Sequence, residues 1–343
     1  MNHPLRVAVV GSGEIAEQHG RALQANPRAK VSAVVDVSEA NATRFAARWG
    51  GRSYPTLEAC LETVDAVYIL TPPSVRTGYT LAAIAAGKHV FCEKPLAGTE
   101  ADARKILSAA AASPVVSMMG LNMRYRTGFG RLREAVKAGE LGRPRHFWRQ
   151  RFGTGPGASG KITDNNWRTD PAFAVGMTVE SFSHDADLLR WILEDEVVWV
   201  SAIVYGTVPD LPAFDNNAYV LFRTAGGVSA TITASWTSWI SCNECGILGE
   251  TGTAFLSGSA PGNNGIWCSR EYHVRTDRDA YERVEMIHDD LDGTSYVRET
   301  EDFINAILDG TSPLTGIRDG YETMRISNAV LESARTGLPV DLG

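Results

Sequence analysis

A chain of 343 residues exceeds the usual size of a single hydrophobic core, so its length predicts two domains. Hydrophobic residues make up 44% and charged residues 21%, as in an ordinary globular protein. The net charge of −7, without any polybasic run, argues against a nucleic-acid partner. Because we find neither a signal peptide nor an apolar run long enough to span a membrane, we expect a cytoplasmic protein with no membrane partner.

The first clear pattern, residues 7–36, reads as strand, glycine turn, helix and strand. Gly11 allows a sharp turn, and Gly13 allows the backbone to approach a pyrophosphate. Ala16, the third small residue, allows the helix to pack closely on the strand. Backbone N–H groups at the helix start would then meet the phosphates of a dinucleotide. The residues expected to bind the cofactor in this turn are Gly11, Ser12, Gly13, Glu14 and Ile15.

Asp36, at the end of the second strand, decides which dinucleotide we expect. A carboxylate at this position accepts hydrogen bonds from the adenosine ribose and repels the 2′-phosphate of NADP. The next residue is Val37 rather than an arginine that would bind that phosphate. A glycine turn alone is a weak signal, but here the helix, the second strand and the acid all fit. The sequence therefore predicts an NAD site, with NADP disfavoured.

Alternating apolar strands and amphipathic helices continue to residue 122, which predicts a parallel, doubly wound sheet. A helical run follows at 175–193. Period-two alternation then dominates from residue 197 to 288 and predicts a large, mostly antiparallel sheet. We therefore predict an α/β protein with a dinucleotide-binding domain at 1–122 and a second α/β domain at 123–343.

Two strand ends of the first domain carry residues toward the expected cofactor. Thr71 and Pro72 follow one strand. Glu93 and Lys94 follow the next, and ligands bind at this edge of open parallel sheets. Pro95 fixes the backbone after Lys94, and a lysine beside the nicotinamide can polarise a substrate oxygen by hydrogen bonding. We assign all four residues to the cofactor site. The alternative for Lys94 is a surface lysine beside a turn.

The helical run of the second domain carries Glu180, His184 and Asp187, whose spacings of four and three place them on one helix face. A carboxylate at hydrogen-bonding distance fixes the tautomer of a histidine and raises its basicity. The three residues are therefore candidate site residues. The alternative is a histidine held by acids for stability alone. A metal site is disfavoured because no second histidine lies nearby.

The five cysteines, an odd number, indicate reduced thiols. Cys242 and Cys245 form a C-x-x-C, but no second ligand pair completes a zinc site. The pair lies in a strand pattern, where residues three apart face opposite ways. We therefore predict buried, unreactive thiols and no metal.

These motifs together resemble the Gfo/Idh/MocA oxidoreductases, named for glucose–fructose oxidoreductase, inositol dehydrogenase and rhizopine catabolism. The segments that carry the resemblance include VGSGEIA, ILTPPS, AGKHVFCEKPLA, NMRY, WRTDP, GETGTA and AVLESARTGLPV. The resemblance implies an N-terminal Rossmann domain, a C-terminal α/β domain with a large open sheet, and dimers or tetramers that pair those sheets. Lys94 falls on the family's catalytic lysine, His184 on its catalytic histidine, and Glu180 on an acid, more often Asp, one turn earlier.

The chain departs from the family pattern near the expected substrate pocket. Pro73 and Arg76 stand where Asn and His are common. Together with the glycine-rich loop at 153–160, Arg76 leaves the substrate undefined. Family members act on sugars, inositols, sugar nucleotides and other carbonyls.

We predict an NAD-dependent oxidoreductase that acts on a CH–OH group of a sugar, inositol or similar cyclic polyol. His184 would take the hydroxyl proton while hydride passes to the nicotinamide, and Lys94 would hold the oxygen. Two alternatives remain open: a glycosidase that uses bound NAD for transient oxidation, and a non-catalytic NAD-sensing regulator. Retention of Lys94 and His184 speaks against the regulator. The residues expected to bind substrate are Arg124, Trp167, Arg168 and Asp187.

Two of these substrate contacts have a structural alternative. Trp167 and Arg168 precede the His184 segment and would serve equally well as a packing residue and its salt bridge.

The strand at 143–152, with Trp236 and Trp239, places large side chains on a sheet without evident helix cover. Two such faces can bury each other symmetrically, so we predict a homodimer or homotetramer. The alternative is that the final helices cover this face.

Overall fold

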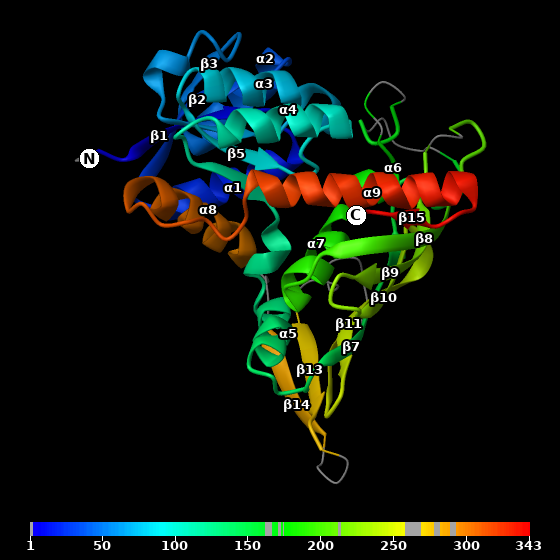
Figure 1. Cartoon of the computed structure of the whole chain (residues 1–343). Helices are drawn as coiled ribbons and strands as arrows, with labels where there is room; N and C mark the ends of the chain where they lie inside the picture. Colours follow the sequence, from blue (N-terminus) through cyan, green and yellow to red (C-terminus); the bar gives the residue numbers. More distant parts are fainter. Residues whose placement is uncertain are drawn as a thin grey trace. The chain divides into compact units, whose positions relative to one another are not determined.

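The computed structural model describes residues 3–161, 167–170, 173, 175–211, 214–257, 269–277, 282–288 and 293–343 (Figure 1). The chain forms two compact units. Met1–Asn122 and Gly293–Met324 make up the first unit, and Met123–Asp292 and Arg325–Gly343 make up the second.

A six-stranded parallel sheet in the order β3-β2-β1-β4-β5-β6 forms the centre of the first unit (Figure 1). Its strands are β1 Leu5–Val10, β2 Ala29–Val35, β3 Arg52–Tyr54, β4 Ala66–Ile69, β5 His89–Glu93 and β6 Ser117–Gly120. Strands β1 and β4 are almost wholly buried, as expected for a parallel sheet covered on both faces. The strand order changes direction between β1 and β4, and ligands of doubly wound sheets bind at this point. The predicted doubly wound sheet is confirmed.

The helices of the first unit are α1 Glu14–Ala25, α2 Glu39–Trp49, α3 Pro73–Ala85, α4 Glu100–Ala111, the short η1 Leu61–Thr63, and α8 Thr294–Leu308. Two of these helices, α2 and α4, begin directly after a side-chain cap. Ser38 caps α2 by accepting the Asn41 N–H, and Thr99 caps α4 by accepting the Asp102 N–H. Each cap satisfies an N–H group that the helix itself leaves without a partner.

Helix α8 packs against α1 and belongs to the first unit, although our sequence boundary placed it in the second domain. Its aromatic side chains fill the core beside the parallel sheet. The Phe303 ring lies 5.5 Å from that of Tyr68 and 5.8 Å from that of Phe91, and the Tyr296 ring lies 5.4 Å from that of His19. Such long-range packing leaves no local trace in the sequence.

The second unit is built on a nine-stranded sheet in the order β14-β13-β12-β11-β7-β10-β9-β8-β15. The strands are β7 Pro144–Thr154, β8 Val197–Tyr205, β9 Asn217–Thr224, β10 Ser229–Ser235, β11 Thr237–Gly249, β12 Thr253–Ser257, β13 Ser269–Arg275, β14 Arg283–His288 and β15 Val340–Asp341. All neighbours pair antiparallel except β10 and β7. The prediction of a large, mostly antiparallel sheet is confirmed.

Helices cover one face of this sheet, and apolar side chains from β7, β10 and β11 form the core beneath them. The helical elements of this part of the chain are η2 Asn122–Tyr125, α5 Thr127–Lys137, α6 Gly176–Glu180, α7 Ser183–Leu193 and α9 Ile317–Thr336. The division between the two units falls within α9, after Met324.

The single helix expected over 175–193 is wrong, because the structure forms two helices, α6 and α7, with a break at Ser181 and Phe182. The N–H groups of both break residues donate to the Met177 carbonyl, at 2.8 and 3.0 Å. The Ser183 hydroxyl donates to the Glu180 carbonyl at 3.3 Å. Serine side chains compete with the helical backbone for hydrogen bonds in this way. Glu180 therefore ends one helix and His184 lies in the next.

Candidate functional site

The glycine turn between β1 and α1 has the backbone that a dinucleotide site needs. Gly11 has a φ of +88°, and a Cβ there would lie 3.0 Å from the Leu70 carbonyl carbon and the Thr71 nitrogen. Only glycine fits this position. A Cβ on Gly13 would meet nothing within 4 Å, so the backbone before Glu14 is open to a ligand. Gly13 caps α1 without any side-chain hydrogen bond, as expected for a helix start that binds an anion.

Asp36 joins the end of β2 to the glycine turn. Its Oδ2 accepts the Ser12 N–H at 2.7 Å and the Ser12 hydroxyl at 2.8 Å, and its Oδ1 accepts the Ser38 N–H at 2.8 Å. The carboxylate is half-buried, and the neighbouring Val37 side chain is fully exposed. The structure thus brings Asp36 and the predicted phosphate turn together. These residues fit NAD, since an anchored carboxylate at this edge suits ribose hydroxyls and opposes a 2′-phosphate.

The Lys94 turn follows β5 at the same edge of the sheet. Lys94 is half-buried, and the peptide bond to Pro95 is cis. The buried Glu93 side chain turns back onto this backbone, because its Oε2 accepts the Lys94 N–H at 2.9 Å. Its Oε1 lies 3.0 Å from Nε2 of His19, a fully buried residue of α1. Glu93 therefore connects α1 to the lysine turn.

Burial would raise the pKa of Glu93, but the hydrogen bond from His19 and the neighbouring cations hold it below its ordinary value. The carboxyl group is therefore ionised and can only accept hydrogen bonds. It follows that Nε2 of His19 carries the proton and donates.

Arg76, whose role the sequence left open, is buried on α3 and bonds to the backbone of two strand ends. Its Nη1 donates to the carbonyls of Glu93 and Pro95, and its Nη2 donates to the carbonyl of Thr71. Pro72 caps α3 directly after that carbonyl. The guanidinium therefore links the two loops that we assigned to the cofactor site.

The second unit carries the other candidates around α6 and α7. His184 and Glu180 are both buried, and Glu180 Oε1 accepts from Arg168 Nη2 at 3.4 Å. The Arg168 guanidinium lies 4.7 Å from the centre of the half-buried Trp167 ring. The structure thus brings Trp167, Arg168 and Glu180 into one group.

The remaining pair, Arg124 and Asp187, is buried and mutually bonded. Arg124 Nε donates to Asp187 Oδ2 at 2.9 Å, and its Nη2 donates to Oδ1. Such a two-point ion pair fixes the orientation of both side chains. It anchors α7, three residues beyond His184, to the segment before α5.

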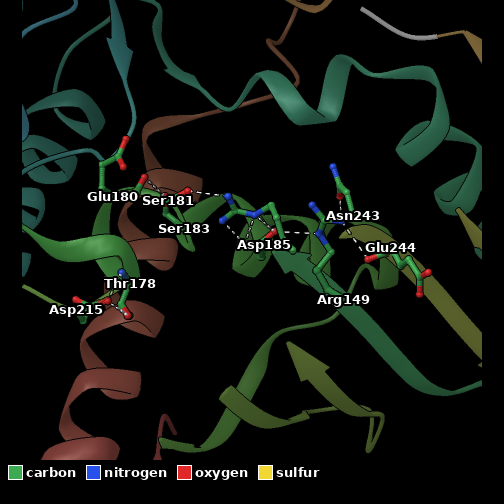
Figure 2. Close-up of polar contacts among 10 residues, drawn as sticks. Arg149, Thr178, Glu180, Ser181, Ser183, Asp185, Asp215, Asn243 and Glu244 are labelled. Carbon is green, nitrogen blue, oxygen red and sulfur yellow. Dashed lines mark hydrogen bonds and ion pairs between the residues drawn. The ribbon is translucent and has the colours of Figure 1, made fainter. Parts of the chain in front are cut away.

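A second anchor for α7, which the sequence analysis missed, lies at Asp185 (Figure 2). This fully buried carboxylate accepts from Arg149 Nε at 2.9 Å and from Arg151 Nη2 at 2.6 Å. Arg149 also donates to the Asn243 side chain and to the Glu244 carbonyl, the latter at 3.1 Å. The sequence did contain a signal for this anchor. In β7, Arg149 and Arg151 follow the apolar Phe147 at a spacing of two, so all three share one face of the strand.

The start of α6 is fixed in turn by Asp215, at the entry to β9 (Figure 2). Its Oδ2 accepts the Thr178 N–H at 2.7 Å and the Thr178 hydroxyl at 2.6 Å. Burial raises the pKa of Asp215 to about 6, although these hydrogen bonds oppose the shift.

Among the described residues, no group of three or more His, Cys, Asp and Glu is arranged to hold a metal ion. Cys245 is buried as predicted, whereas Cys242 is only half-buried, and Cys60 and Cys92 are buried too. Cys268 lies outside the described residues. In the part of the chain that the structure describes, we find no helix with the length and apolar character needed to cross a bilayer.

Comparison with known proteins gives two family matches. Residues 5–121 match the model described as "Oxidoreductase family, NAD-binding Rossmann fold", and residues 129–255 match "GFO/IDH/MocA C-terminal domain". Inositol 2-dehydrogenase 3 of Saccharopolyspora erythraea is 26% identical over 98% of this chain and 96% of its own. An inositol 2-dehydrogenase of Cereibacter sphaeroides is 29% identical over 98% of this chain and 97% of its own.

Solved structures with the same fold include two that contain the cofactor. Levoglucosan dehydrogenase in complex with NADH and levoglucosan superposes with a TM-score of 0.88 at 22% identity, over 99% of this chain and 100% of that one. GenD2 from gentamicin A biosynthesis, in complex with NAD, gives a TM-score of 0.84 at 25% identity, over 100% of this chain and 97% of that one.

Proposed function

Because this chain belongs to the Gfo/Idh/MocA oxidoreductase family, we propose that it transfers hydride between NAD and a CH–OH carbon of a sugar, inositol or similar cyclic polyol. The protein is an NAD-dependent oxidoreductase with a Rossmann domain. The observation that carries the proposal is Lys94, held at the same carboxyl edge of the parallel sheet as the glycine turn and Asp36.

The residues that would hold NAD lie at the ends of four neighbouring strands. The backbone of the glycine turn would bind the pyrophosphate, and Asp36 would bind the adenosine ribose. Thr71, Pro72 and the Glu93–Lys94 turn would lie toward the nicotinamide. When bound, NAD accepts or returns the hydride.

For oxidation, we assign the proton transfer to His184 and the oxygen to Lys94. The neutral imidazole takes the hydroxyl proton, and the ammonium group donates a hydrogen bond to the same oxygen as its charge develops. Glu180 supports the base from the end of α6 and is held by Arg168. For reduction, the same groups act in reverse.

Of the predicted substrate contacts, we propose Trp167 and Arg168 as direct ones, because both are only partly buried. The buried ion pair of Arg124 and Asp187 supports a role in setting the position of α7 beneath the substrate. The second unit would thus form the substrate-binding and oligomerisation domain, without the 293–324 segment that the expected 123–343 boundary had included.

The test is a screen of cyclic polyols and sugars, with myo-inositol and levoglucosan first, for NAD⁺ reduction at about 340 nm, where reduced nicotinamide absorbs. Stoichiometric release of NADH is the expected result. Hydrolysis of a glycoside without net NADH would identify the glycosidase alternative. NADH binding without turnover of any compound would favour the regulator.

We further propose that the protein assembles through the outer face of its nine-stranded sheet. One row of paired residues crosses this face from β9 to β14: Leu221, Thr231, Trp148, Gly246, Phe255, His273 and Val284. Large apolar side chains on the same face are exposed, namely Ile203, Tyr219, Leu221, Leu248, Val284 and Met286. A broad apolar sheet face of this kind suits symmetric burial against a second copy, in a homodimer or homotetramer.

Cytoplasmic residence is part of the same proposal. The four described cysteines are unbridged, which fits a reducing compartment.

A further inference from the structure

Three ionisable side chains are buried around the Lys94 turn and take no part in the proton and hydride transfer assigned above. His19 comes from α1, Arg76 from α3, and Glu93 from the end of β5. His19 is fully buried, and Glu93 and Arg76 are 5% and 3% exposed. Buried ionic groups contribute little to stability compared with apolar residues of similar size. Their grouping around one short turn therefore calls for a role in geometry.

The contacts of these side chains hold the backbone of Lys94 on both sides. The Lys94 N–H is bound by Glu93 Oε2 at 2.9 Å, and the other oxygen of this carboxylate is bound by His19. The carbonyls of Glu93 and Pro95 both accept from Arg76 Nη1. The peptide group before the lysine is thus held from both ends, by Glu93 of β5 and by Arg76 of α3, and Arg76 also holds the peptide group that follows Pro95.

Arg76 also connects the turn to the neighbouring strand end, through its Nη2 and the Thr71 carbonyl. The charges favour this arrangement, because the buried guanidinium of Arg76 lies close to the buried carboxylate of Glu93. The Arg76 backbone is held in turn, because its carbonyl accepts the Thr80 hydroxyl at 2.9 Å.

We propose that His19, Glu93 and Arg76 are positioning residues, which fix the Lys94 backbone so that its ammonium group meets the substrate oxygen in the reactive geometry. The inference rests on the proposed role of Lys94. A displacement of about 1 Å in a reacting group can reduce the rate about 100-fold without contact to substrate. The positioning residues should therefore affect kcat more than cofactor affinity.

Two variants of His19 separate its hydrogen bond to Glu93 from the packing of its ring. Its ring packs against the rings of Tyr68, Phe91 and Tyr296, at 5.6, 5.0 and 5.4 Å. His19→Phe keeps an aromatic ring but removes the donor to Glu93. His19→Gln keeps a donor near the position of Nε2 but removes the ring. His89→Gln, at the other end of the same β5, is the matched control.

The assays are amide hydrogen exchange of peptides spanning residues 93–97, NADH binding by fluorescence, and NAD⁺ reduction with myo-inositol as the probe substrate. In His19→Phe we expect faster exchange at Lys94 and a loss in kcat of about 10- to 100-fold. The NADH Kd should stay within about threefold, since the glycine turn and Asp36 supply most of that binding. His19→Gln and His89→Gln should resemble the wild type in all three assays.

The reverse order, with His19→Gln impaired and His19→Phe normal, would overturn the inference and assign His19 to packing. Unchanged exchange at Lys94 in His19→Phe would also overturn it, whether or not the probe is turned over. If His19→Phe does not fold, Glu93→Asp takes its place, because the shorter side chain cannot reach both donors at once. Glu93→Asp should then show the exchange and kcat changes expected for His19→Phe, and wild-type values would refute the proposal.

Lys94→Met separates this inference from the function on which it rests. If Lys94→Met retains activity, the proposed catalytic role of Lys94 fails. If Lys94→Met is inactive while His19→Phe shows faster exchange at Lys94 but turns over the probe normally, only the positioning role fails.

Discussion

Asp36 combines two tasks in one carboxylate. It organises the glycine turn through Ser12, and it presents negative charge at the place where a ribose would bind. The same group therefore shapes the site and selects the cofactor. The charge of Asp36 should therefore determine the preference between NAD and NADP, and its hydrogen-bonding oxygens should determine the geometry of the turn.

Asp36→Ser should weaken NADH binding by about 10-fold, in line with the loss of hydrogen bonds to a charged group, and should narrow the preference for NADH over NADPH. Asp36→Asn separates the two tasks, because it removes the charge but keeps an acceptor for Ser12. Fluorescence titration of both cofactors measures the effect. Tighter binding of NADPH than NADH by the wild type would show that the role of Asp36 is misread.

His184→Ala should lower kcat by about 100- to 10,000-fold, the usual cost of losing a general base, and Lys94→Ala should be comparably severe. NADH affinity should change little in either variant. For oxidation, wild-type kcat/KM should rise with pH as the histidine loses its proton, because only the neutral imidazole accepts a proton. Single-turnover hydride transfer is the decisive measurement. Near-wild-type rates in both variants would mean that the site is misplaced.

At the level of elements, the interrupted helix α6–α7 is held by buried carboxylates at several points. Asp215 binds the start of α6, Asp185 binds α7 to β7, and Asp187 binds α7 to Arg124. His184 lies directly before the Asp185 anchor in sequence and three residues before the Asp187 anchor. Its position is therefore set by charge pairing as much as by apolar packing.

Asp185→Asn should lower the free energy of unfolding by about 3–5 kcal/mol, because the buried Arg149 and the partly buried Arg151 lose their counter-charge. Urea denaturation measures the loss. The exposed Asp210→Asn serves as the charge-matched control and should change stability by less than about 0.5 kcal/mol. Equal effects of the two substitutions would refute a structural role for the Asp185 network.

Asp215 should make stability depend on pH, because burial raises its folded pKa to about 6 from an ordinary value of 3.8. The folded state then binds more protons than the unfolded state between these values. The stabilisation is complete below the unfolded pKa and is lost as the pH rises through about 6, for a total of about 3 kcal/mol at about 1.4 kcal/mol per pKa unit. The wild-type stability minus that of Asp215→Asn should fall by most of this amount, about 2.4 kcal/mol, from pH 4 to 7. A flat difference would contradict the assignment.

For the whole molecule, the exposed sheet face is the main candidate for assembly. Leu221→Arg places a charge among the exposed apolar side chains at the β9 end of the outer face and should reduce the mass measured by light scattering at micromolar concentration. Ala138→Arg, at an exposed helix end, is the control and should leave the oligomer intact. A monomeric wild type would refute the assembly proposal.

Local sequence patterns predicted a large part of this molecule, because their causes are local. The glycine turn, the helix that follows it and the doubly wound sheet all follow from patterns of neighbouring residues. The break after Glu180 was not predicted, because the helical periodicity of the sequence continues through it. In the structure, a serine hydroxyl bonds to the backbone there and interrupts the helix.

The partners of buried charges were harder to foresee. Arg149 and His19 were not assigned, since their carboxylate partners lie far away in the sequence. The catalytic roles of Lys94 and His184 stay predictions.

The packing of α8 on the parallel sheet bears on how the protein is made. Phe303 and Tyr296 cover Tyr68, Phe91 and His19, which are synthesised much earlier. When the ribosome has completed the first 122 residues, the aromatic core of the cofactor unit is still uncovered. The nascent Rossmann segment must wait, with apolar surface exposed, while the whole second sheet is translated. Cofactor binding and chaperone protection would therefore compete for the same unfinished unit until the last helices leave the ribosome.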